Sequence, residues 1–111
     1  HRRVEDVLSR PGLQDLTAWV DFTTVAEAAV AAGLEVAGFA TQAHFLLGAG
    51  LERELAAAPA GDAAAGLAQS QALATLLLPG EMGERCKAIM LARGVAGPWS
   101  GFGFRDLAAT L

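Results

Sequence analysis

The placement of two strand-like segments constrains the fold of this chain more than any other feature. Residues 34–40 (LEVAGFA) follow a helix stop at Gly33. Residues 84–93 (ERCKAIMLAR) lie between two glycines. Short apolar runs bounded by glycine are typical of strands. Because an isolated pair of strands is marginal in water, the missing strands must come from a longer parent protein or from a second copy.

The first helix is expected over about residues 22–32. Asp21 can cap it by accepting a hydrogen bond from a free backbone N–H, and a capping box that starts at Thr24 is the alternative. Its apolar stripe at helical spacing is formed by Val25, Ala28, Ala29 and Ala32.

Two further helices are expected between the strands. The second begins after Thr41, its expected N-cap, and has two glycines in its middle that weaken it. The third covers residues 62–78, where Leu67, Ala74 and Leu78 can share a buried face. The predicted order is therefore helix, strand, helix, helix, strand.

Two glycine-bearing segments add detail to this order. Gly38 weakens the first strand but allows another backbone to come close. Residues 98–104 (PWSGFGF) are glycine-spaced and aromatic, which indicates a strand end or an ordered loop. The length of 111 residues is enough for one domain.

Composition excludes several classes of protein. Hydrophobic residues make up 53% and charged residues 18%, which opposes long disorder. The net charge of −4 opposes a nucleic-acid surface, which needs a basic face. The longest run without charge, residues 63–80, is broken by polar residues and glycine, so we expect a buried helix there and no membrane contact. The single Cys86 rules out an internal disulfide and fits a reducing, cytoplasmic compartment.

Motifs for cofactors or metals are absent from the sequence. There is no G-x-G-x-x-G, P-loop or H-E-x-x-H pattern, so we expect no cofactor-binding or metal-ligating residue here. His44 is expected to be a packed or partly exposed core histidine. Cys86 is expected to be a small buried hydrophobe.

The most distinctive polar cluster is Asp15, Thr17 and Asp21. Two carboxylates six residues apart are able to line one pocket together. The other interpretation is structural, with Asp21 capping the first helix and Asp15 capping the preceding turn. The spacing favours capping over pocket lining.

Three stretches, in order and with similar gaps, resemble the MidA-type family of SAM-dependent methyltransferases. QDLTAWVDF at 14–22 looks like that family's D-[IL]-T-A-H-V-D-F segment. Residues 32–47 resemble its A-G-L-x-x-x-G-x-x-T-Q-x-x-F-L-L stretch. LPGEMG at 78–83, followed by Lys87, looks like its P-x-x-M-G-x-x-F-K block. His1 would be the histidine of the family's Y-R-x-H segment.

The resemblance implies an α/β fold: the C-terminal part of a class I, Rossmann-like methyltransferase domain over residues 1–111. It would comprise the last helix–strand unit, a helical insertion at about 43–78 and the final antiparallel strand. The cofactor S-adenosylmethionine (SAM) would bind in the parent's N-terminal half, so the chain alone would be inactive. Mitochondrial members methylate an arginine of a respiratory complex I subunit during assembly, so the resemblance also implies a protein substrate.

The resemblance also implies site residues. Asp15, Thr17 and Asp21 would line the acceptor side of the cleft, where a carboxylate can hold a guanidinium bidentately. His1 and Gln42 are further candidates for substrate binding. Trp19 departs from the family, which usually has histidine at that position.

The alternative function is a non-catalytic interaction module. Open strand edges pair with other chains, so self-association through those edges is expected in either case. The sequence upstream of His1 would separate the two functions: a G-x-G-bearing strand–helix unit there favours the enzyme.

Overall fold

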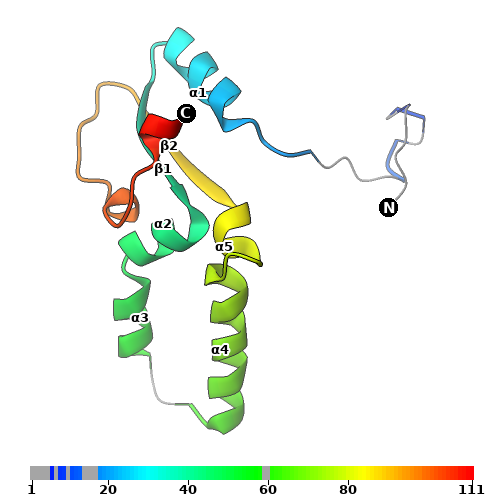
Figure 1. The fold of residues 1–111 in the computed structure, drawn as a ribbon, viewed down its shortest axis with the longest axis vertical. Coiled ribbons are helices and arrows are strands. Elements are labelled where there is room, and N and C mark those ends of the chain that lie inside the picture. The colour runs from blue at the N-terminus through cyan, green and yellow to red at the C-terminus, as the bar shows by residue number, and fades with distance from the viewer. Residues whose placement is uncertain (1–5, 7, 10, 14–17, 59–60) are drawn as a thin grey trace.

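The computed structural model describes residues 6, 8–9, 11–13, 18–58 and 61–111. A helix, a strand, a run of helices and a second strand follow one another along the chain, and the two strands form one antiparallel pair, which confirms the predicted α/β arrangement (Figure 1). The elements are α1 (Phe22–Ala31), β1 (Glu35–Thr41), α2 (Gln42–Gly48), α3 (Leu51–Ala57), α4 (Ala63–Leu77), α5 (Met82–Arg85), β2 (Lys87–Ala92) and two 3₁₀ turns, η1 (Ser100–Phe102) and η2 (Ala108–Thr110).

The two strands pair from Glu35 with Ala92 to Thr41 with Lys87, with a bulge between Val36 and Gly38. The second strand begins later than the predicted residue 84, because Met82–Arg85 forms one turn of helix instead. This turn packs tightly on the end of α4. A Cβ on the buried Gly83 would overlap the backbone carbonyl of Leu77, so only glycine fits there.

Helix α1 covers one face of the pair. Asp21 caps it, as predicted, and Gly33 ends it with φ at +77°. The predicted apolar stripe is partly wrong, since Ala28 and Ala32 are exposed and the buried residues are Ala26 and Ala29. The helix is turned this way because it packs on β1, with the rings of Phe22 and Phe39 5.1 Å apart.

The second predicted helix is split in two. Thr41 caps α2 as predicted by accepting a hydrogen bond from the N–H of His44 (3.2 Å). Gly50 then adopts φ +97°, a left-handed conformation, and α3 starts after it in a new direction. Glycine takes this conformation without the steric cost that other residues have.

Aromatic rings fill the opposite face of the pair. The ring of Phe102 lies directly over Gly38, where a Cβ would overlap it. The ring of Phe45 lies over Gly101 and 5.3 Å from that of Phe102. The expected backbone approach at Gly38 is therefore wrong: a side chain occupies that space. Residues 98–104 are an ordered loop with a 3₁₀ turn rather than a strand end.

The C-terminal tail lies along the outer edge of β1. The carboxylate of Asp106 accepts a hydrogen bond from the N–H of Phe39 (3.0 Å). The N–H of Leu107 donates to the carbonyl of Phe39 (2.7 Å). The tail thus satisfies both backbone groups of Phe39, and β2 is left as the unpaired edge among the described residues.

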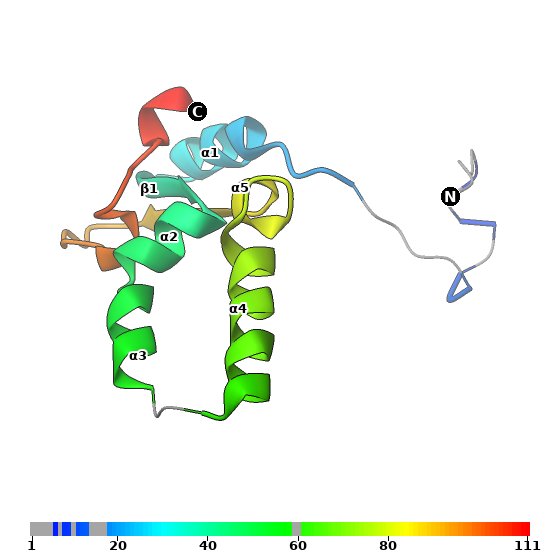
Figure 2. The same ribbon diagram turned by 60° about the horizontal axis from the view of Figure 1, so that its bottom comes forward.

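Helices α3 and α4 form an arm that extends away from the sheet, as Figure 2 shows. Neither helix has a buried residue. The predicted buried face of α4 is wrong at Leu67 and Leu78, which are 62% and 52% exposed, whereas Ala74 is half-buried. Only the C-terminal end of α4 reaches the rest of the fold, at α2 and α5. No helix within the described ranges is long and apolar enough to span a membrane.

Candidate functional site

The chain direction brings two distant segments to one edge of the sheet. Helix α1 leads into β1 and runs back along it, so the start of α1 lies near the carboxyl end of β1 at Thr41. The antiparallel β2 begins at the same edge, where Lys87 pairs with Thr41. In open α/β sheets, ligands bind outside the carboxyl ends of the strands, so a ligand site is expected at this edge.

A cleft of about 530 Å³ lies at this edge. One wall is the extended segment before α1 with the first helical residue, and the other is the α5–β2 junction. The lining residues are Ala18, Trp19, Val20, Phe22, Glu84, Arg85, Cys86 and Lys87. The cleft therefore combines an apolar wall with a wall that carries both signs of charge.

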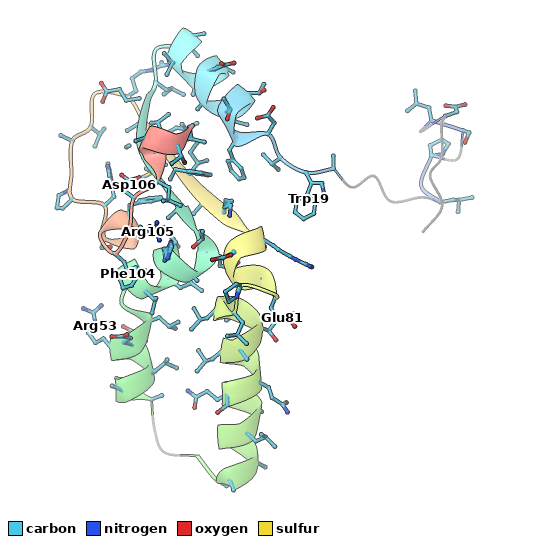
Figure 3. The ribbon with its side chains drawn as sticks, viewed as in Figure 1. Trp19, Arg53, Glu81, Phe104, Arg105 and Asp106 are labelled. Atoms are coloured by element: carbon cyan, nitrogen blue, oxygen red, sulfur yellow. The ribbon has the colours of Figure 1, made fainter. Side chains whose placement is uncertain are left out.

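The apolar wall is unusually exposed. Trp19 is 85% and Val20 60% exposed, and Figure 3 shows Trp19 on the segment beside α5, outside the packed body. On the other wall, the Lys87 ammonium donates to the backbone carbonyl of Glu84. Cys86 is a half-buried free thiol, less covered than the small buried hydrophobe that the sequence predicts.

Asp21 is placed next to this cleft by its capping role. Its carboxylate oxygens accept hydrogen bonds from the Thr24 N–H (3.2 Å) and the Thr24 hydroxyl (2.9 Å). The Thr24 backbone N–H, followed by its hydroxyl, lowers the pKa of Asp21 below its ordinary 3.8. Asp21 is therefore ionised at neutral pH, and one negative charge stays at the edge of the cleft.

The other predicted site residues lie away from the cleft or outside the residues that the structure describes. The Gln42 side-chain amide donates to the Leu76 carbonyl (3.0 Å) and so ties α2 to the end of α4; its substrate role stays a prediction. His1, Asp15 and Thr17 lie outside the described residues. His44 is half-buried, as expected, and its ring lies 5.6 Å from that of Phe104.

A second, smaller pocket of about 320 Å³ lies on the aromatic side of the sheet. Its lining includes Phe45, Ile89, Met90, Trp99 and Phe102. No titratable side chain lines it, so it suits apolar packing rather than acid–base or charge recognition.

The described residues do not fit a SAM site. Glycine-rich turns between a strand and a helix let a nucleoside cofactor approach the backbone, but the turn from β1 to α2 is formed by Thr41 and Gln42. The start of α1 is already capped by a carboxylate. Within the described ranges, no group of three or more His, Cys, Asp or Glu side chains is placed to hold a metal ion.

Comparison with known proteins supplies the family context. Residues 1–40 match the model of a family described as "Putative S-adenosyl-L-methionine-dependent methyltransferase". The chain is similar to methyltransferases. That match includes the segment that forms the apolar wall of the cleft. No curated protein matches the chain.

Two solved structures from Burkholderia thailandensis share this fold. One is a COG1565 superfamily member bound to S-adenosyl-homocysteine (SAH): it is 42% identical over 91% of this chain and 26% of its own, with a TM-score of 0.82. The other is an uncharacterized COG1565 superfamily protein, 40% identical over 100% of this chain and 30% of its own, with a TM-score of 0.84. This chain thus spans less than a third of either relative.

The residues Glu84–Lys87 were not identified from the sequence as one wall of the cleft. These residues were assigned to a strand, because the run between Gly83 and Gly94 has a strand-like composition. The signal that marks the helical turn is Gly83 itself, which is needed where the turn contacts the backbone of α4.

Proposed function

We propose that this chain is the acceptor-side, C-terminal portion of a SAM-dependent protein methyltransferase of the MidA type, with an arginine side chain as the methyl acceptor. The observation that carries the proposal is the cleft between residues 18–22 and 84–87. One of its walls belongs to the methyltransferase family match. The SAH-bound relative supports SAM as the cofactor of a longer protein.

The proposed task of this region is to orient the acceptor. SAM, when bound, supplies an electrophilic methyl group, and no step of that transfer is assigned to the described residues. Asp21 contributes negative charge beside the cleft, and Asp15 and Thr17 are proposed to add polar contacts on the same side. A carboxylate can pair with a guanidinium through two hydrogen bonds and so fix its plane, which places the reacting nitrogen.

The test uses a longer protein that contains this region. Saturable SAH binding and SAM-dependent methylation of arginine in a protein substrate, with a complex I subunit as the first candidate, are the expected results. The 111-residue chain alone is expected to bind no SAM in calorimetry. SAH binding by the longer protein without methylation of any arginine-containing protein would rule out the proposed acceptor.

Asp15 and Asp21 are proposed to differ in the longer protein. Asp15→Ala should lower methyl transfer and leave the melting temperature nearly unchanged. Asp21→Ala should lower the melting temperature first, because the Thr24 N–H loses its acceptor. Equal losses of stability with full activity in both variants would remove Asp15 from the acceptor site.

The alternative, an interaction or oligomerisation module, is favoured by one observation. The tail covers the outer edge of β1 at Phe39, whereas β2 has no second strand beside it among the described residues. An open strand edge presents unpaired N–H and C=O groups to other chains. Self-association of the isolated chain through β2 is therefore expected in sedimentation, and a monomer at high concentration would contradict it.

A further inference from the structure

We propose that Trp19 forms the stacking wall for the acceptor's planar cation in the cleft at the carboxyl end of β1. The inference deepens the proposed function and rests on it. It assigns substrate contact to a residue in which this chain departs from the histidine of the MidA-type pattern. Three features of the cleft support it: the exposure of the indole, its position, and the carboxylate in the same lining.

The indole of Trp19 is uncovered, and the chain just after it is anchored to the fold. Two residues further on, Asp21 caps α1, and Phe22 packs its ring on Phe39 at 5.1 Å. Trp19 itself is 85% exposed, and no aromatic ring stacks on it within the described part of the chain. Aromatic side chains contribute large contact areas when they are covered, so a ring presented in this way is suited to contact a ligand.

The wall opposite Trp19 supplies a carboxylate. Glu84 lines the same cleft and makes no ion pair with another described residue. A guanidinium can stack its plane on an indole face and at the same time direct its N–H groups at a carboxylate. These two contacts need an aromatic face and a carboxylate in one cleft, and the lining includes both Trp19 and Glu84.

Two cationic side chains, Arg85 and Lys87, lie on the same wall as Glu84 and limit which ligand the cleft can bind. Lys87 is turned back onto the Glu84 carbonyl, and Arg85 is exposed at the cleft. Net charge therefore does not attract cations to this cleft. Recognition within the lining depends on the flat face of the indole and on the Glu84 carboxylate, with Asp21 adding negative charge beside the cleft. An indole face and a carboxylate suit the planar guanidinium of arginine better than the compact ammonium of lysine.

The test compares Trp19→Ala and Trp19→Phe in the longer protein, with Leu67→Ala on the distant arm as the matched control. Trp19→Ala should raise KM for an arginine peptide by roughly 2- to 30-fold. The value of kcat and the affinity for SAH should stay unchanged. Trp19→Phe should restore most of the loss, because a ring face remains. The control should leave KM unchanged.

A second readout separates this inference from the proposed function. Titration of the longer protein with the arginine peptide should quench tryptophan fluorescence, and the part due to Trp19 should disappear in Trp19→Ala. Quenching without methyl transfer would support the stacking wall and overturn the proposed function. Methyl transfer with an unchanged KM in Trp19→Ala would overturn the stacking wall alone. A lower melting temperature in Trp19→Ala with unchanged KM would likewise overturn it, showing that the indole packs against the rest of the protein.

Discussion

The sheet region and the helical arm of this protein are stabilised in different ways. The buried hydrophobic residues all belong to the sheet, to α1 or to η1: Ala26, Ala29, Phe39, Ala40, Ala92 and Phe102. The arm, α3 and α4, has none among its described residues. A helix of 15 residues is marginal in water without tertiary packing. Tertiary burial therefore stabilises the sheet region, whereas the arm has only its local helical interactions and the contacts at the C-terminal end of α4.

The largest expected difference between the two regions lies in amide hydrogen exchange. Amides of α4 should exchange through local opening, whereas those of β1 and β2 should require opening of the whole sheet region. We expect protection factors roughly 100-fold or more apart, since opening free energies range from near zero to the global value. Equal protection in α4 and β1 would show that the arm is packed against a partner in solution.

The same substitution in the two regions should have opposite effects. Gly38→Ala should destabilise the protein by about 1–3 kcal/mol, because the new methyl group overlaps the Phe102 ring and the site is overpacked. Gly66→Ala in α4 meets no atom within 4 Å, and it should stabilise that helix by about 0.5–1 kcal/mol. Denaturant unfolding with circular dichroism measures both. A neutral Gly38→Ala would mean that the ring moves aside freely.

Removal of one carboxylate from each region sharpens the contrast further. Asp106→Ala leaves the part-buried N–H of Phe39 without its acceptor, at a cost of about 1–3 kcal/mol. Asp62→Ala removes the N-cap of α4, whose oxygen accepts from the Ala65 N–H at 2.8 Å, at a cost of about 1 kcal/mol. The first loss should appear in the melting temperature of the sheet region. The second should appear only as reduced helix content.

The smallest expected effect is a pH dependence at the start of α1. The pKa of Asp21 is lowered in the folded state by the Thr24 N–H. Its contribution to stability is therefore fully present above the unfolded pKa of about 3.9 and is lost as pH falls through the folded value. Asp21→Asn, which keeps an oxygen acceptor but has no charge, should remove this dependence. Melting temperatures of the two proteins across acidic pH provide the measurement. Parallel curves would contradict the assignment.

The candidate site was predicted from the sequence only in part. Asp21 was predicted as a helix cap with a place beside the cleft, and Trp19 was noted as a departure from the family pattern. Glu84, Arg85 and Cys86 were missed as part of the wall, because the strand is predicted to begin at Glu84, whereas β2 begins at Lys87. Gly83 is a local signal, but composition and spacing do not reveal that it must approach the backbone of Leu77, where the helical turn packs on the end of α4.

The sequence by itself determined where several elements begin or end. The caps Asp21 and Thr41 and the stop at Gly33 were predicted correctly, because each acts on a backbone group within a few residues of itself. The tertiary structure alone decided which faces are buried. It turned Ala26 rather than Ala28 of α1 into the core. It also joined Asp106 to Phe39, 67 residues away in the chain. Such contacts depend on how whole elements pack, and neither residue carries a local signal for its distant partner.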